Sequence, residues 1–313
     1  MEIKLIVFTL VLSSILNYGI QRIFIYFKKF DDFNHRSSHK TLATRTGGIG
    51  VYVTVLSISL FFYFQNIELF DYSLFIPLSI MFIVGVYDDF YNANFKLKFF
   101  LQIIVAKILI DQGYIIDNYY GLFGLREIPW LIAQLTTIFV FLVVVNAINF
   151  IDGIDGLAIS QTIKSIILFE VYSNKLSEIS ILGFLCILSM LPLFYFNFKK
   201  KRKIFLGDSG SLLLGTLVMI FILFVLDDEF IFQDDLKLNK TLFTVLMVLY
   251  PLIDLLRVFI LRVYRGFSPF IADQNHIHHK AMSIFHGNHF KSLISIIVIE
   301  IVIILLVTKL LIN

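Results

Sequence analysis

Long apolar runs alternate with short polar breaks along nearly the whole chain, and this pattern predicts a bundle of membrane-spanning helices. A spanning helix needs roughly 20 mainly apolar residues. Cutting the sequence at charged and Gly-, Pro- or Asn-rich breaks gives about ten such segments. They lie near residues 3–27, 47–65, 72–87, 97–112, 129–147, 157–173, 179–198, 209–226, 241–262 and 290–312. We therefore expect an all-α integral membrane protein with about ten transmembrane helices and a single domain over residues 1–313.

Composition supports lipid rather than water as the main solvent. Hydrophobic residues make up 58% of the chain and charged residues 16%, against about 25% charged residues in soluble domains. A soluble enzyme, a disordered protein and a nucleic-acid binder are therefore poor interpretations. Cys186 is the one cysteine, which excludes a disulfide framework, an iron–sulfur cluster and a cysteine-based zinc site. The first apolar run lacks a basic leader and a cleavage site, so we expect a retained span rather than a signal peptide.

The loops between the predicted spans divide into two sets by charge. With alternating topology, one side receives 28–46, 88–96, 148–156, 199–208 and 263–289. These loops hold thirteen Lys and Arg residues, and the opposite loops hold four. Because basic loops stay in the cytoplasm, this bias places the first set inside and both termini outside the inner (plasma) membrane. The clusters of acids, glycines and histidines all fall in the first set, which predicts one active site in the cytoplasmic loops.

Two acidic motifs in these loops could bind a metal or act on a substrate. Asp88 and Asp89 follow an apolar run, where paired carboxylates are costly unless they are solvated, paired or metal-bound. Asn149, Asp152 and Asp155 lie in NFIDGIDG, and spacings of three place them on roughly one face of a helix or turn. Carboxylates with substrate phosphates are the usual ligands of Mg²⁺. An ordinary helix end is the alternative for the Asp pair.

A third acid and a histidine cluster complete the set. Asp208 begins a predicted span in FLGDSGS, where it or Ser209 could cap the helix, or the N-terminal N–H groups could bind phosphate beside a metal. His276, His278 and His279 lie in HIHH. They could bind zinc, but the lack of cysteines and of an H-E-x-x-H motif favours contact with phosphate.

Basic residues beside these motifs are candidate phosphate ligands. Lys96 and Lys98 follow the Asp pair, and His39 and Arg45 lie in SSHKTLATRTGG. Basic flanking charge of the cytoplasmic side is the alternative for both lysines. Some further charges lie inside predicted spans without an assigned role. Among them are Asp254 and Arg257, which are spaced to pair within one helix, and Lys107 and Glu300. Together these groups predict a magnesium-dependent phosphoryl-transfer site.

Five motifs, in the same order, resemble the polyprenyl-phosphate N-acetylhexosamine-1-phosphate transferases of glycosyltransferase family 4, which includes the MraY and WecA types. They are GVYDDF, NAINFIDGIDGLA, FLGDSGSLLLG, PLIDLLRVFILR and SPFIADQNHIHH, and with the NHRSSHK segment they cover roughly residues 34–280. The resemblance implies that a cytoplasmic UDP-N-acetylamino sugar donates its sugar 1-phosphate to a polyprenyl (undecaprenyl) phosphate with release of UMP. The product would start synthesis of a cell-envelope polysaccharide.

The resemblance also implies roles for residues. Asp208 and Asn149 would bind Mg²⁺, with Mn²⁺ as an alternative, and Lys98 would contact diphosphate. Two departures concern the donor sugar: His35 stands where related members have Glu, and Gln274 where they have Arg. The NHRSSH segment favours the O-antigen and surface-polysaccharide branch, and a homodimer is left open.

The acid pair need not act as a base in this reaction. A phosphate monoester has a second pKa near ~6, so the lipid phosphate is already mostly dianionic at neutral pH. We expect this phosphate to attack directly, while Asp88 and Asp89 orient substrate or metal. The alternatives are a transporter, which would place its acids near the membrane midplane, and another lipid phosphotransferase.

Overall fold

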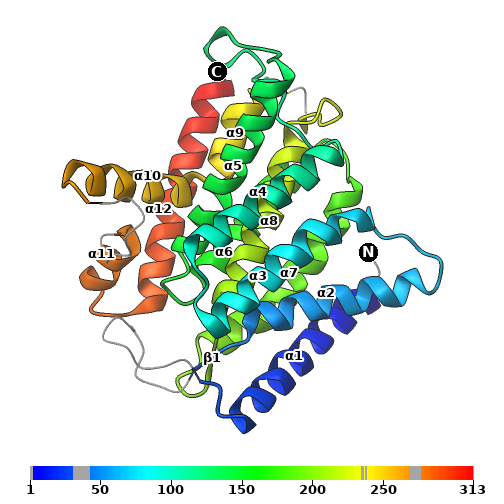
Figure 1. Ribbon diagram of the computed structural model, residues 1–313, viewed down its shortest axis with the longest axis vertical. Helices are drawn as coiled ribbons and strands as arrows, with labels where there is room; N and C mark the ends of the chain where they lie inside the picture. The colour runs from blue at the N-terminus through cyan, green and yellow to red at the C-terminus, as the bar shows by residue number, and fades with distance from the viewer. Residues whose placement is uncertain (1–2, 31–42, 234–235, 237, 268–275, 313) are drawn as a thin grey trace. The chain divides into compact units, whose positions relative to one another are not determined.

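The computed structural model describes residues 3–30, 43–233, 236, 238–267 and 276–312. Within them the chain forms twelve α-helices, two 3-10 turns and one pair of short strands (Figure 1). The helices are α1 (Ile3–Tyr26), α2 (Gly47–Tyr63), α3 (Phe75–Tyr91), α4 (Phe95–Asp111), α5 (Trp130–Phe150), α6 (Leu157–Tyr172), α7 (Glu178–Asn197), α8 (Gly207–Val225), α9 (Lys240–Met247), α10 (Leu249–Tyr264), α11 (Ile277–Ile284) and α12 (His289–Ile312). The 3-10 turns are η1 (Tyr72–Leu74) and η2 (Leu122–Gly124). The predicted all-α class is confirmed.

All ten predicted segments are helical, but they are not equally long. Six helical segments are long and apolar enough to cross a membrane, and the bent pair α9–α10 would make a seventh. Helices α2, α4 and α6 have 17, 17 and 16 residues, at or below the short end of the ~17–25 residues that a span needs. By length alone, the described residues therefore give six or seven spans where the sequence predicted about ten.

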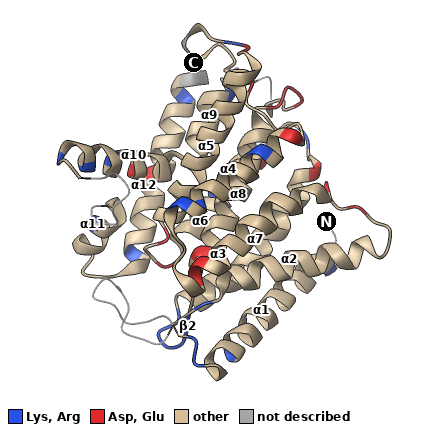
Figure 2. Cartoon of the chain, in the orientation of Figure 1, with Lys and Arg blue, Asp and Glu red and all other residues tan. Residues whose placement is uncertain are grey.

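The burial pattern of α1 is the reverse of that in a soluble protein. Its buried residues are polar and recur every fourth position: Thr9, Ser13, Asn17 and Gln21. Ile15, in contrast, is 62% exposed. The Ser13 hydroxyl donates to the Ser189 carbonyl of α7 at 2.7 Å. Helices in lipid associate through small and polar residues and present apolar ones outward, and most of the helical ribbon carries no charge (Figure 2). The chain is a multi-pass membrane protein.

The described residues divide into two compact units. Unit 1 comprises 1–105 and 176–216, and unit 2 comprises 106–175 and 217–313. In unit 1, α1 packs on α2 and α7, and α2 also packs on α3. Strands β1 (Ala43–Arg45) and β2 (Lys203–Phe205) pair in parallel, with Arg45 opposite Phe205. This pairing was not predicted, and it fixes the start of α2 beside the start of α8, where the Gly48 N–H donates to the Leu206 carbonyl at 2.9 Å.

Unit 2 is organised around a broken helix. Helices α9 and α10 meet at an angle of 78°, and α10 packs on α5 while α9 packs on α6. The break exposes backbone groups that lipid cannot satisfy. The Ser165 hydroxyl donates to the Met247 carbonyl at 2.7 Å, and the Glu300 carboxylate accepts from the Tyr250 N–H at 3.0 Å. Glu300 also pairs with Lys164 at 2.6 Å, which gives a structural role to a charge that the sequence left unassigned.

Candidate active site

The Asp pair lies in the last turn of α3, and its two members have different partners. Successive residues of a helix point about 100° apart, because a turn takes ~3.6 residues. The Asp88 carboxylate accepts from the Ala93 N–H at 2.7 Å and pairs with the Lys98 ammonium at 2.5 Å. Asp88 and Lys98 thus tie the end of α3 to the start of α4. Lys96 is exposed on the same helix and its side chain does not share this contact.

Asp89 binds the start of α8. Its carboxylate accepts from the N–H groups of Asp208 and Ser209, both at 2.9 Å. The sequence left two readings for these N–H groups: capping by Asp208 or Ser209, and binding of phosphate. In the structure the side chain of Asp89, an anion that the positive end of the helix attracts, accepts from both groups. Binding of phosphate beside this helix start stays a prediction.

Close packing of α3 against α8 makes this contact possible. A Cβ atom at Gly85 would lie 2.3 Å from the carbonyl oxygen of Asp208, nearer than any real Cβ contact. Only a glycine therefore allows the backbone of α3 to approach α8 one turn before Asp89. The strand pair adds Arg45, whose guanidinium lies 3.9 Å from the Asp89 carboxylate.

A pocket of about 360 Å³ opens beside Asp89 in unit 1. Its polar lining has three cations and one carboxylate: Lys28, Lys29, Arg45 and Asp89, with Asn92. Its apolar lining is mainly aromatic: Phe24, Phe30, Ile49, Val86 and Phe90. A net positive pocket with an apolar wall suits an anionic head group that carries a hydrocarbon chain.

The second acidic motif lies in unit 2, between α5 and α6. Asn149 lies in the last turn of α5, and Asp152 and Asp155 follow in a series of turns. Asp155 is buried, and its backbone N–H donates to His289 Nδ1 at 3.1 Å. The Asp155 carboxylate lies 3.4 Å from the same ring nitrogen. His289 was not among the predicted site residues, and no local sequence motif marks it.

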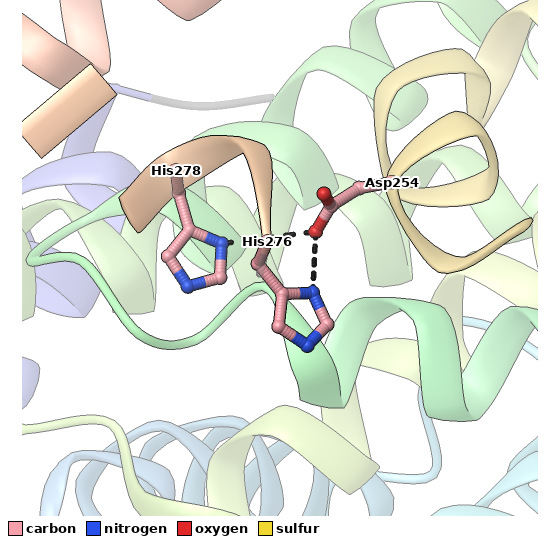
Figure 3. Close-up of side chains that lie close together, drawn as sticks. All are labelled: Asp254, His276 and His278. Carbon is pink, nitrogen blue, oxygen red and sulfur yellow. Dashed lines mark hydrogen bonds and ion pairs between the residues drawn. The ribbon is translucent and has the colours of Figure 1, made fainter. Parts of the chain in front are cut away.

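Three histidines stand at the start of α11, and Asp254 of α10 holds the first of them (Figure 3). The Asp254 carboxylate lies 2.7 Å from His276 Nδ1 and accepts from the Ile277 N–H at 2.6 Å. The His278 ring is 1% exposed, and a Cβ atom at Gly153 would lie 2.5 Å from its Nε2. The glycine of the second acidic motif therefore leaves room for this imidazole.

Electrostatics set the protonation state of His278. Burial, with a smaller contribution from the adjacent His279, lowers the pKa of its imidazole to about 3. His278 is therefore neutral at physiological pH. The ring of His279 lies 4.4 Å from that of His278, measured between centroids, and is less buried.

The structure thus groups the predicted site residues within each unit. Unit 1 brings together Asp88 with Lys98, and Asp89 with Arg45 and Asp208. Lys96 also belongs to unit 1, and unit 2 holds the remaining described candidates: Asn149, Asp152, Asp155, His276, His278 and His279. His39 lies outside the described residues, as do His35 and Gln274. That all of them serve one site stays a prediction.

Comparison with known proteins identifies the family. The profile of "Glycosyl transferase family 4" matches residues 71–226, half of the chain. The chain belongs to glycosyl transferase family 4. The family profile includes the Asp pair, the NFIDGIDG motif and Asp208, whereas Asp254 and the histidines lie beyond its matched range.

Similar proteins carry related names. The chain is 27% identical over 268 residues to a "Probable undecaprenyl-phosphate N-acetylglucosaminyl 1-phosphate transferase" of Bacillus subtilis, covering 84% of this chain and 72% of that protein. An Escherichia coli undecaprenyl-phosphate alpha-N-acetylglucosaminyl 1-phosphate transferase is 26% identical (80% and 68% covered). A Mycobacterium leprae decaprenyl-phosphate N-acetylglucosaminephosphotransferase is 29% identical (81% and 70% covered). Membership of this family favours the transferase hypothesis over the transporter.

Proposed function

We propose that this family 4 protein transfers an N-acetylhexosamine 1-phosphate from a UDP-sugar to a polyprenyl phosphate at the cytoplasmic face of the inner membrane. A phosphate oxygen of the lipid forms a bond to the sugar-linked phosphorus. The bond from that phosphorus to the oxygen of the uridine monophosphate breaks, and UMP leaves. The product is a lipid-linked diphosphate sugar that starts a cell-envelope polysaccharide. The names of the relatives support the acceptor and the transferred group.

One observation carries this proposal: the pocket beside Asp89. Lys28, Lys29 and Arg45 give it positive charge, and its aromatic wall gives it an apolar side. A phosphate dianion would be attracted by the cations, and the first isoprene units would lie against the aromatic residues. Cations beside an aromatic wall match the two parts of a lipid phosphate, its charged head group and its hydrocarbon chain.

The acids of unit 1 fit a magnesium ion in their chemistry. Asp89 and Asp208 repel one another electrostatically, and a divalent cation would relieve that repulsion. Mg²⁺ usually takes one or two carboxylates and completes its shell with water and substrate phosphates. Asp208 is the residue we expect to contribute, because Asp89 already accepts two N–H groups. When bound, the ion would neutralise diphosphate charge.

The contacts of Asp88 support an orienting role rather than that of a base. Its carboxylate is buried and already engages Lys98 and the Ala93 N–H. Asp88 therefore positions the ammonium of Lys98, which can neutralise charge on the diphosphate. If Asp88→Asn loses turnover that high pH restores, a proton-transfer role replaces this one. A loss that is independent of pH supports positioning.

Purified full-length protein in lipid nanodiscs tests the proposal. We expect UMP release from UDP-N-acetylglucosamine, or from another UDP-N-acetylamino sugar in a panel, only with undecaprenyl phosphate and Mg²⁺. Asp208→Ala should abolish this turnover while the protein stays folded. Asp117→Asn, which changes an exposed loop carboxylate, serves as the matched control. Failure to release UMP from every donor in the panel would contradict the proposed function.

A further inference from the structure

Three buried side chains of unit 2 converge on one point. Asp254 of α10 and His276 and His278 at the start of α11 each offer one ligand atom, and these atoms lie within 4.8 Å of one another. Their exposed fractions are 0%, 7% and 1%. We call them the His/Asp cluster (Figure 3). Among the described residues this is the one group of three such side chains that could hold a metal ion.

Hydrogen bonding within the His/Asp cluster leaves one ligand unsatisfied. One oxygen of Asp254 accepts from the Ile277 N–H, and the other lies 2.7 Å from His276 Nδ1 and 3.8 Å from His278 Nδ1. The longer separation is no hydrogen bond, and His278 Nδ1 is buried without a hydrogen-bond partner among the described residues. A buried polar atom left without a partner costs about 1–3 kcal/mol. An additional group between the three ligand atoms would remove this cost.

We propose that the His/Asp cluster binds a divalent transition-metal ion, with Zn²⁺ as the preferred ion. Two imidazole nitrogens and one carboxylate oxygen form a ligand set that zinc uses, at bond lengths of about 2.0–2.2 Å. Mg²⁺, in contrast, prefers oxygen ligands. The site is thus distinct in chemistry from the magnesium site expected at Asp208, and it does not depend on the proposed transfer reaction.

The surroundings of the cluster are arranged as they are around known metal ligands. The Ile277 N–H fixes the carboxylate of Asp254 through its other oxygen, and such outer hydrogen bonds orient metal ligands. The backbone of Gly153 confines the His278 ring on its Nε2 side. Burial keeps His278 neutral, which is the form that binds a metal. Three protein ligands would leave a fourth tetrahedral position, as in catalytic zinc sites.

A bound ion would join α10 to α11. Asp254 already links these helices through His276 and Ile277, and a metal would add His278. The start of α11, and with it His279, would then have a fixed position. The simpler reading is an Asp–His hydrogen bond without metal, and the experiment must separate the two.

Metal analysis of tag-free, full-length protein tests the site directly. After chelator treatment we expect stoichiometric uptake of Zn²⁺ and, with Co²⁺ as a spectroscopic probe, the visible bands of a tetrahedral complex. His278→Ala and the shape-conserving Asp254→Asn should each weaken Zn²⁺ affinity by on the order of 100-fold or more. His286→Ala, which removes an exposed histidine of the same segment, should leave uptake unchanged.

The outcomes decide the proposal whatever the enzyme does. Helix content, measured by circular dichroism, shows whether each variant is folded. If His278→Ala does not fold, Asp254→Asn provides the test. The site is supported if the folded variants of the His/Asp cluster lose Zn²⁺ while the parent protein and His286→Ala keep it. No uptake by the parent protein, or equal uptake by all variants, overturns it and leaves the metal-free Asp–His pair. UMP release is measured separately, so failure of the transfer reaction does not bear on the metal.

Discussion

Asp89 and Glu300 each cap the beginning of a helix in this protein, and Asp89 also lines the pocket of unit 1. Asp89 in unit 1 accepts from two N–H groups at the start of α8, both at 2.9 Å. Glu300 in unit 2 accepts from the Tyr250 N–H at the start of α10, at 3.0 Å. Both satisfy donors that a helix leaves unpaired and that lipid cannot satisfy.

Their remaining partners differ. Glu300 is 3% exposed and is surrounded by protein donors: its oxygens also accept from Lys164 and Gln161, each at 2.6 Å. Asp89 lines the pocket that contains Lys28, Lys29 and Arg45. Glu300 thus satisfies a backbone donor at the bend between α9 and α10, whereas Asp89 places a negative charge at the pocket. Residue type and helix position alone do not separate a structural acid from a functional one.

Removal of Glu300 gives the largest expected effect. Glu300→Ala leaves the ammonium of Lys164 buried without a counter-ion, and breaking a buried ion pair costs about 3–5 kcal/mol. We expect a large fall in the midpoint of thermal unfolding in detergent, followed by circular dichroism. Turnover per folded molecule should change little. A variant that is as stable as the parent but inactive would assign Glu300 to the reaction instead.

Asp89→Asn should have the opposite signature. The amide oxygen can still accept one N–H, so we expect a stability change within about 1 kcal/mol. Removing the charge should lower turnover on the order of 100-fold, since a single group that stabilises charge is worth that much in other enzymes. The measurement is the initial rate of UMP release. A variant with normal turnover would reduce Asp89 to a helix cap.

A double substitution sharpens the interpretation of Glu300. Lys164→Met with Glu300→Gln removes both charges and keeps an oxygen for the Tyr250 N–H. Replacing both members of a buried pair is often nearly neutral, so the free energy of unfolding of this variant should lie within about 1–2 kcal/mol of that of the parent. If the double variant is as unstable as Glu300→Ala, the ion pair itself stabilises the break.

Lys28→Ala should give the smallest effect. A basic residue near a membrane surface contributes about 1 kcal/mol to binding an anionic lipid, which corresponds to roughly a fivefold rise in KM for polyprenyl phosphate. The KM for the UDP-sugar should stay unchanged. Lys4→Ala, at the other end of α1, is the control. Equal effects of both variants would indicate general surface charge rather than the pocket.

The helices were predictable because each depends on a local apolar run. The pairing of β1 with β2 was not predictable, since Ala43 and Lys203 are far apart in the sequence. The bend between α9 and α10 depends likewise on Ser165 and Glu300 from other helices. Length is a third case, because a polar break does not show how much of an apolar run becomes helical.

The same distinction applies to the candidate site. Short motifs identified Asp88, Asp89 and Asp208 as candidates. They did not show that the side chain of Asp89 binds the backbone of Asp208. Asp254 lay in a motif without a role until its contact with His276 was seen. Lys107 had no assigned role in the sequence, and in the structure it pairs with Asp111 of its own helix. The sequence thus identifies the charged and metal-binding side chains, whereas their contact partners depend on the tertiary structure.

The fate of the sugar-linked phosphorus distinguishes transfer of a sugar phosphate from transfer of the sugar alone. UDP-N-acetylglucosamine labelled with radioactive phosphorus in the β position would be incubated with the purified protein, undecaprenyl phosphate and Mg²⁺. We predict that the label moves to the lipid fraction and that unlabelled UMP is released in equal amount. Label that stays with the nucleotide as UDP while sugar reaches the lipid would show transfer of the sugar alone, and would contradict the proposed function.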